Sequence, residues 1–186
     1  MDKLFEDYFD VKESELSFES ALSDENLSQE RISELMNYQM LFLPIRKYHN
    51  KEGYFFYNAT RDFYLYCKNE SPGNHFEYCT EKKDYREISL NADIVYFGKF
   101  LIKNIALPIF INLMSNYISN RLTDKDDKVI STIIIQNEET NKSDEITFRG
   151  TKEDFSEKVI NTLQTYTKEG KMKIPEQKGV NINVLS

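Results

Sequence analysis

The sequence is poor in the residues that carry most enzyme chemistry. It contains no Trp, two Cys, two His, six Gly and four Pro among 186 residues. Two Cys exclude a disulfide-dense scaffold, and six Gly leave few backbone loops that could cradle a phosphate. The dinucleotide-binding, P-loop, nucleophile-elbow and zinc-peptidase motifs are all missing. We therefore expect no catalytic residue and no cofactor.

What is present is the composition of an ordinary folded domain. Hydrophobic residues make up 40% and charged residues 30% of the chain, which argues against disorder and against a multi-span membrane protein. The length fits one domain, or one domain with an appended arm. The most apolar stretch, residues 91–122, is interrupted by Asp93, Lys99 and Lys103. Because charges are costly inside a bilayer, we expect no membrane span.

Negative charge is concentrated at the N-terminus. Residues 1–36 contain eleven acids and three bases, a net charge of −8, whereas the remaining chain carries +1. This asymmetry predicts an acidic arm over residues 1–24 on a nearly neutral body. Such an arm repels phosphate, so we expect a partner with a basic protein surface rather than nucleic acid. The chain opens without a cationic and apolar signal peptide, which predicts a cytoplasmic location.

The acidic arm also carries the candidate binding face. Four large apolar residues follow the spacing i, i+1, i+4, i+5, which predicts one aromatic face on a short helix: Leu4, Phe5, Tyr8 and Phe9. This face could fill a groove in a partner. It could equally fold back onto the core of its own chain, with residues 12–24 as a loop. We take these four residues as protein-binding candidates, and the sequence leaves both modes of docking open.

Residues 25–90 predict a helix followed by a small aromatic β region. Apolar residues at helical spacing predict a helix over 28–43, which Pro44 ends. Beyond it, aromatic residues predict three short strands, of which the last two form a hairpin: 54–58, 62–68 and 75–80. Residues 61–68 also fit a helix that continues from Asn58.

Residues 91–186 predict a central helix and a β-β-α-(β) unit. The apolar stretch predicts a buried helix over 91–122 that is kinked at Pro108. After it come a predicted hairpin, a capped helix and a closing strand, at 129–136 with 145–149, at 151–169 and at 180–184. We therefore predict an α+β fold in which the kinked helix packs on a small antiparallel sheet. Residues 25–186 are compatible with one domain.

The four Cys and His residues cluster within 31 residues, at His49, Cys67, His75 and Cys79. Two thiolates and two imidazoles suit tetrahedral zinc, but the spacing lacks a Cys-x-x-Cys knuckle. The same residues could form a Cys-dependent nucleophilic site, although no activating group is evident. The simpler interpretation is two buried thiols and two surface imidazoles, with no metal.

The order of elements in the C-terminal half resembles a known class of proteins. An apolar helix (Asp93–Leu122), a hairpin (129–149) and a capped helix (Thr151–Leu163) follow one another. This pattern, over residues 92–165, resembles the small accessory and effector-associated components of bacterial conflict (anti-phage) systems. The resemblance implies a non-enzymatic adaptor and carries over no catalytic residue.

Together these observations lead to one expectation about function and two alternatives. We expect a protein-binding accessory or regulatory subunit of a bacterial defence or toxin-related system. One alternative is an acidic immunity or antitoxin protein that masks a basic toxin. The other is a small zinc-binding protein or Cys-dependent enzyme that uses the Cys/His cluster.

Overall fold

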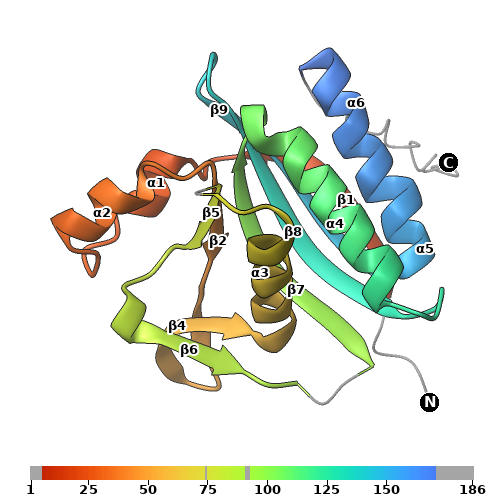
Figure 1. Cartoon of the computed structure of the whole chain (residues 1–186), viewed down its shortest axis with the longest axis horizontal. Coiled ribbons are helices and arrows are strands. Elements are labelled where there is room, and N and C mark those ends of the chain that lie inside the picture. Colours follow the sequence, from red (N-terminus) through yellow and green to blue (C-terminus); the bar gives the residue numbers. More distant parts are fainter. Residues whose placement is uncertain (1–5, 74, 91–92, 171–186) are drawn as a thin grey trace, which may run out of the picture.

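The computed structural model describes residues 6–73, 75–90 and 93–170 (Figure 1). These residues form one six-stranded sheet, one three-stranded sheet and helices that pack on both faces of the larger sheet. The α+β class predicted from the sequence is confirmed. In the described part of the chain, no helix has the length and apolar character needed to cross a membrane.

The larger sheet is mixed rather than antiparallel. Its strands lie in the order β1 (Tyr8–Ser14), β9 (Lys142–Thr151), β8 (Lys128–Asn137), β7 (Ile94–Lys103), β2 (Met40–Leu43) and β5 (Phe76–Tyr78). The β7–β8 and β2–β5 pairs are parallel, and the other pairs are antiparallel. A parallel pair needs a crossover connection, which helix α4 (Leu107–Arg121) supplies between β7 and β8.

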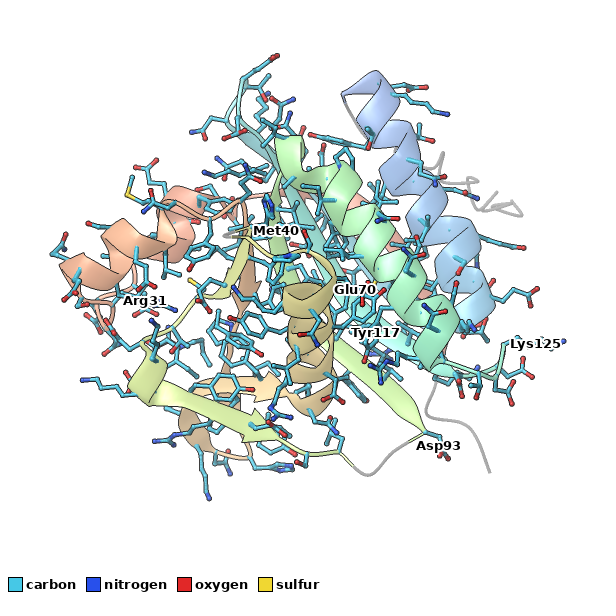
Figure 2. All side chains as sticks on the ribbon, in the orientation of Figure 1. Arg31, Met40, Glu70, Asp93, Tyr117 and Lys125 are labelled. Carbon is cyan, nitrogen blue, oxygen red and sulfur yellow. The ribbon has the colours of Figure 1, made fainter. Side chains whose placement is uncertain are left out.

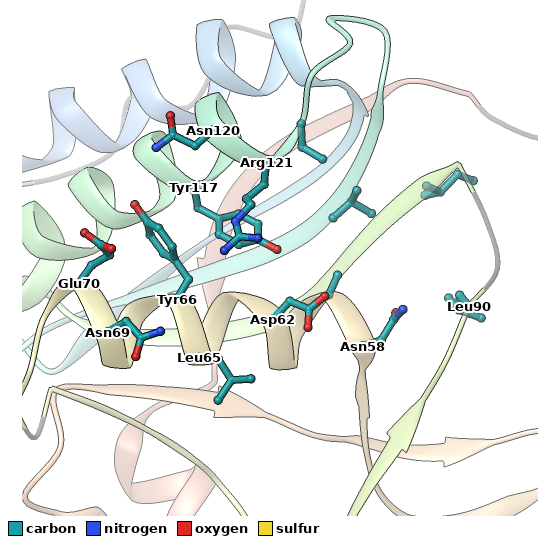
Figure 3. Close-up of a pocket in the computed structure, with 14 residues that line it drawn as sticks. Asn58, Asp62, Leu65, Tyr66, Asn69, Glu70, Leu90, Tyr117, Asn120 and Arg121 are labelled. Atoms are coloured by element: carbon teal, nitrogen blue, oxygen red, sulfur yellow. The ribbon is translucent and has the colours of Figure 1, made fainter.

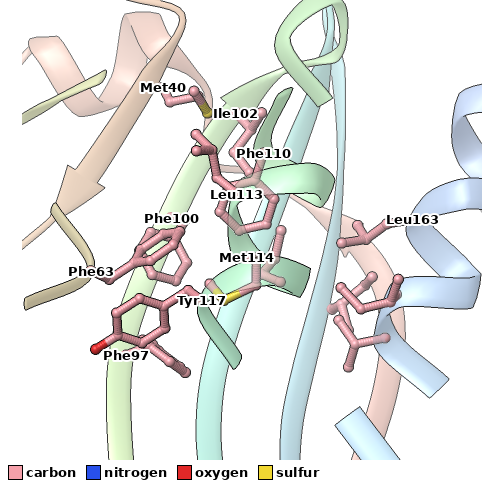
Figure 4. Packing of buried hydrophobic residues seen from close by; sticks show 14 of the residues in the cluster. Met40, Phe63, Phe97, Phe100, Ile102, Phe110, Leu113, Met114, Tyr117 and Leu163 are labelled. Carbon is pink, nitrogen blue, oxygen red and sulfur yellow. The ribbon is translucent and has the colours of Figure 1, made fainter. Parts of the chain in front are cut away.

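The face that carries the longer helices, here called the front face, holds an aromatic core. Helix α3 (Asn58–Glu70), helix α4 and the continuous helix formed by α5 (Lys152–Asp154), a π-helical turn (Phe155–Ile160) and α6 (Asn161–Glu169) cover it. Phe63 of α3 lies 5.8 Å from both Phe97 and Phe100 of β7 and 5.2 Å from Tyr117 of α4, measured between ring centroids (Figure 4). We call this cluster the front core.

The opposite, back face is covered by two short helices, α1 (Phe18–Leu22) and α2 (Gln29–Leu35). Their apolar side chains pack with Leu41, Leu101 and Ile134, which project from β2, β7 and β8 away from the front core. We call this second cluster the back core. Because successive strand residues alternate between faces, these central strands are apolar on both sides.

The smaller sheet consists of β3 (Ile45–Tyr48), β4 (Lys51–Tyr57) and β6 (Tyr85–Ile88), and a 3-10 turn (Lys82–Asp84) precedes β6. A ladder of rings joins it to the larger sheet and to α3. Phe56 lies 5.1 Å from Tyr85, Tyr85 lies 4.9 Å from Tyr78, and Tyr78 lies 4.2 Å from Tyr64. The aromatic residues of this region therefore serve packing between elements.

The predicted β-β-α unit is confirmed. Strands β8 and β9 form the expected hairpin. The Thr151 hydroxyl accepts a hydrogen bond from the Asp154 backbone N–H at 3.1 Å, as the capping pattern predicts. Gly170 follows the helix with a φ of +71°, the left-handed conformation that favours glycine after a helix. The predicted closing strand at 180–184 lies outside the described residues.

The predicted central helix over 91–122 is wrong in its first half. Residues Ile94–Lys103 form strand β7, a 3-10 turn (Asn104–Ala106) follows, and only Leu107–Arg121 is helical. A strand that is buried on both faces has no polar alternation, so its sequence resembles that of a buried helix. Pro108 lies in the first turn of α4 rather than at a kink, where its missing N–H costs no helical hydrogen bond.

Two predictions for residues 25–90 are also wrong. The helix predicted over 28–43 ends at Leu35, and Met40–Leu43 forms β2. Residues 62–68 belong to α3, as the alternative interpretation proposed, so they form no hairpin with β5. Strand β5 instead pairs in parallel with β2. These segments are short, and their conformation follows from their neighbours in the sheet.

The N-terminal helix prediction is wrong as well. Tyr8 and Phe9 lie in β1, which pairs with β9 over seven residues, while Leu4 and Phe5 lie outside the described residues. Phe9 and Val11 face the front core. A short isolated helix is marginal in water, whereas pairing with an existing strand supplies backbone hydrogen bonds and buries alternate side chains.

Candidate protein-docking surface

Helices α1 and α2 form a small lobe, residues 17–36, which projects beside β2 and β5 (Figure 1). Serine caps begin both helices. The Ser17 hydroxyl accepts from the Ser20 backbone N–H at 3.1 Å, and the Ser28 hydroxyl accepts from the Arg31 backbone N–H at 3.1 Å. Such caps satisfy backbone donors that a helix start leaves unpaired. Part of residues 12–24, considered above as a loop, is thus ordered as helix α1 and its cap.

A buried arginine anchors this lobe to the rest of the molecule. Arg31 belongs to α2 and is 4% exposed; it is labelled in Figure 2. Its Nε donates to the Thr80 carbonyl at 2.8 Å, and its Nη2 donates to the Tyr78 carbonyl at 3.0 Å. Its Nη1 lies 2.7 Å from Glu34 Oε2, an ion-pair contact without hydrogen-bond geometry. The guanidinium thereby joins α2 to the end of β5 and lowers the pKa of Glu34.

A second anchor lies between the two helices, at Asp24. Its carboxylate accepts from the Tyr54 hydroxyl at 3.0 Å and forms an ion pair with Arg46, which also stacks over the Tyr54 ring. Burial alone would raise the pKa of Asp24. The hydrogen bonds from the Asn26 backbone and from Tyr54, together with the charge of Arg46, outweigh burial and lower that pKa overall. Asp24 is therefore held as a carboxylate at neutral pH.

An apolar notch opens between the two helices of the lobe. Four apolar side chains line it, and its volume is about 330 Å³: Phe18, Leu22, Ile32 and Met36. Met36 is 62% exposed. Glu19, Ser23 and Lys103 complete the wall, and the Lys103 ammonium lies 3.9 Å from Glu138. An exposed methionine beside buried aromatic and aliphatic groups can adapt to the shape of an incoming side chain.

The segment that carries the lobe is acidic, and one of its glutamates, Glu19, lines the notch. Five exposed glutamates lie in the segment from the end of β1 to α2, and in the described part of the chain none of them forms an ion pair: Glu13, Glu15, Glu19, Glu25 and Glu30. The two bases of the same segment are both engaged, Lys12 with Glu145 at 3.6 Å and Arg31 as described. The acidic arm expected from the sequence is thus replaced by an acidic surface on a folded lobe.

A larger groove lies on the other side of the molecule, between α3 and α4 (Figure 3). It has a volume of about 740 Å³, and Asp62, Leu65, Tyr66, Tyr117 and Arg121 are among its lining residues. Burial raises the pKa of Tyr117 to about 12, so its hydroxyl stays protonated and can donate a hydrogen bond. The groove presents charges of both signs and therefore shows no preference for a basic or an acidic partner.

The structure separates the four residues of the predicted zinc or thiol site. Cys67 lies in the front core and Cys79 in the back core, on opposite faces of the sheet. His49 lies in the turn between β3 and β4, and His75 contacts Gln39 at 3.3 Å. Within residues 6–73, 75–90 and 93–170, no group of three or more His, Cys, Asp or Glu could hold a metal ion. Both thiols are free and buried, as the simpler interpretation predicted for them.

Neither thiol is activated. Burial raises the pKa of the Cys79 thiol to about 12 and raises that of Cys67 well above its ordinary range. A thiol is nucleophilic as the thiolate. Both cysteines are therefore poor nucleophiles at neutral pH, and the Cys-dependent alternative has no support from this geometry.

The predicted binding face is also divided. Tyr8 is 50% exposed on the back of β1, whereas Phe9 is partly buried against the front core. Sequence reasoning missed the notch, although a signal was present. Phe18 and Leu22, like Ile32 and Met36, are apolar pairs at i, i+4, the spacing of one helix face.

Comparison with models of protein families, with curated proteins and with solved structures finds no match to this chain. Of the surfaces of the molecule, the α1–α2 lobe combines an apolar centre, an excess of exposed glutamates and firm anchoring to the core.

Proposed function

We propose that this chain is a non-enzymatic accessory subunit that binds a basic protein through the α1–α2 lobe. The observation that carries the proposal is the apolar notch, with Glu19 in its wall, on a segment whose exposed glutamates have no ion-pair partner in the described part of the chain. Protein interfaces commonly have an apolar centre and a polar rim. The lobe has this arrangement, with Glu19 and Lys103 beside the apolar centre and an excess of glutamates along the same segment.

The size and charge of the surface indicate what the partner presents. A notch of about 330 Å³ admits one or two large apolar side chains, which would act as the anchor of the interface. The glutamates attract Lys and Arg around that anchor and raise the association rate at low salt. The expected partner segment is therefore basic and amphipathic, as in a helix that docks by one face.

The biological setting that we propose is a bacterial defence or toxin-related system. Its support is the resemblance in sequence of residues 92–165 to accessory components of such systems. The hairpin and the capped helix of that pattern are present in the structure, whereas Ile94–Lys103 is a strand. An immunity or antitoxin protein would use the same acidic surface to mask a basic toxin. The two roles differ in the complex formed, because masking gives a one-to-one complex whereas an adaptor joins a larger assembly.

A labelled amphipathic peptide of Leu and Lys tests the surface directly, with fluorescence anisotropy as the measurement. Met36→Ser removes apolar area from the notch and is expected to weaken binding by about fivefold, equivalent to about 1 kcal/mol. Glu19→Lys is also expected to weaken binding, and its effect should be larger at low salt than at high salt, because salt screens exposed charges.

Matched variants elsewhere on the surface control for nonspecific effects. Leu65 is 44% exposed on α3, and Glu157 is exposed in the π-helical turn Phe155–Ile160, both on the front face and away from the notch. Leu65→Ser and Glu157→Lys should leave the affinity for the peptide unchanged. If the lobe variants and the control variants weaken binding equally, the peptide reports only net charge and hydrophobicity, and the proposed site is wrong.

A further inference from the structure

Strand β1 leaves one long edge of the larger sheet without a strand partner among the described residues. It is the terminal strand, and β9 is its neighbour on the other side. Its pairing with β9 runs over seven residues without a register shift, and it contains no Pro. Edge strands are commonly protected by bulges, prolines or charges that discourage further pairing. This edge has neither a bulge nor a proline.

The charges on β1 are arranged in a self-complementary way. Phe9 and Val11 face the front core, so Asp10 and Lys12 project from the back face. The Lys12 ammonium lies 3.6 Å from Glu145 of β9. Asp10 forms no ion pair with any residue that the structure describes. The strand therefore presents an acid and a base two residues apart on one face, with Val11 between them.

We infer that β1 pairs with β1 of a second copy of this chain, antiparallel and about a twofold axis at Val11. In this register Asp10 of each copy faces Lys12 of the other, and all seven residues of each strand take part. Opposite charges directly across an antiparallel pair stabilise it. The surface is the same on both copies, as a twofold interface requires.

Neighbouring registers are less favourable. A twofold axis perpendicular to the sheet keeps the side chain of each residue on the same face in both copies. Such an axis must pass beside a residue, which then lies opposite the same residue of the other copy. The alternative registers therefore place the axis at the residue before or after Val11. An axis at Asp10 places Asp10 opposite Asp10, and an axis at Lys12 places Lys12 opposite Lys12. Each also shortens the overlap of the seven-residue strands to five. Like charges across a pair are destabilising, so the charge pattern selects the axis at Val11.

This inference goes beyond the proposed function and concerns a different surface. Pairing through β1 joins the two six-stranded sheets into one and leaves both α1–α2 lobes in place. The resulting dimer would present two acidic docking surfaces. Two linked sites bind a partner with two basic segments much more tightly than one site does, provided that the geometry lets both engage.

Charge reversal tests the inference, with sedimentation equilibrium of the full chain as the measurement. The wild type is expected to be a dimer. Asp10→Lys and Lys12→Asp each place two like-charged pairs in the interface and are expected to weaken the dimer by at least about tenfold. An equimolar mixture of the two variants restores opposite charges at both positions and is expected to form a heterodimer.

Two controls distinguish loss of the β1 interface from misfolding and from a general effect of changed surface charge. Thermal unfolding should show both variants folded, and Lys142→Glu, a charge reversal in the exposed end of the hairpin, should leave the dimer intact. A wild type that stays monomeric at about 100 µM, a concentration at which contacts of modest affinity associate, overturns the inference. A mixture that stays monomeric, or single variants that dimerise like the wild type, also overturns it. Failure here leaves peptide binding by the lobe unaffected.

Discussion

The two faces of the large sheet are covered in different ways. The front face lies under α3 and α4, of 13 and 15 residues, and under the helix that ends in α6. The back face lies under α1 and α2, of 5 and 7 residues. The front core is held by aromatic packing, whereas the back lobe depends on polar anchors at Arg31 and Asp24 in addition to its apolar contacts.

This difference separates scaffold from binding surface. Apolar burial is non-directional and gives the front core much of its stability. Two short helices are marginal on their own, so directional hydrogen bonds from Arg31 and Asp24 add to apolar packing in setting the position of the lobe. The lobe can then leave Met36 and several glutamates exposed. The comparison predicts that the two faces respond differently to the following changes.

The largest expected effect is loss of an aromatic ring in the front core. Phe63 is fully buried among five other rings. Phe63→Ala should lower the free energy of unfolding by about 4 kcal/mol, because it removes a buried ring and leaves a cavity. Urea denaturation measures this change. Leu65→Ala, on the exposed side of the same helix, should cost less than about 1 kcal/mol, and an equal loss in both would contradict a packed front core.

The next effect concerns the anchor of the back lobe. Arg31→Met keeps the apolar stem but removes the hydrogen bonds to Tyr78 and Thr80. It should lower the free energy of unfolding by about 3 kcal/mol, because a buried network loses one partner. It should also weaken peptide binding by the lobe. Lys83→Met, at an exposed position, should change stability by less than about 0.5 kcal/mol.

The two cysteines report local opening of each face. Cys67 is a residue of α3 that is buried in the front core, and Cys79 is buried in the back core beneath the lobe. Because the lobe is small, we expect it to open more often than the front core, and an alkylating reagent should modify Cys79 at least about tenfold faster than Cys67 under native conditions. Mass spectrometry of the labelled peptides measures both rates. In urea the two rates should converge, and faster labelling of Cys67 in the folded protein would reverse the comparison.

The smallest expected effect is pH-dependent. The pKa of Asp24 is lowered in the folded protein, so its charged form stabilises the fold above the ordinary carboxyl pKa, and this stabilisation is lost as pH falls through the lowered value. Asp24→Asn should cost about 1 kcal/mol at pH 7. The difference from the wild type should shrink below about pH 4. Asp126→Asn, at an exposed position, should change the free energy of unfolding at pH 7 by less than about 0.5 kcal/mol.

The sequence predicted the C-terminal unit well because its signals are local. Asp154, three residues after Thr151, donates its backbone N–H to the Thr151 cap, and Gly170 adopts the left-handed conformation that favours glycine. A short polar turn joins β8 and β9. Each of these features depends on residues close together in the chain. Neighbouring residues therefore carried enough information to identify the hairpin and the helix.

The sequence predicted the candidate site only in part. It showed the excess of acids over residues 1–36, from which a basic partner stays a prediction, but it placed the apolar face on Leu4, Phe5, Tyr8 and Phe9. The notch instead forms where Phe18 and Leu22 of one helix meet Ile32 and Met36 of another. Which short helices meet depends on anchors such as Arg31 with Thr80, which are 49 residues apart.

Composition, charge asymmetry and local caps thus determined the α+β class, the β-β-α unit and the acidic character of the N-terminal segment. Tertiary structure decided that residues 94–103 are a strand, that residues 8–14 complete a sheet edge, and that Glu19 of the acidic segment lies in the wall of an apolar notch. The physical reason is that the parallel β7–β8 pair, the β1–β9 pair and the Arg31 anchor connect distant residues. Their free energy exists only once the sheet has assembled, so no local pattern could express it.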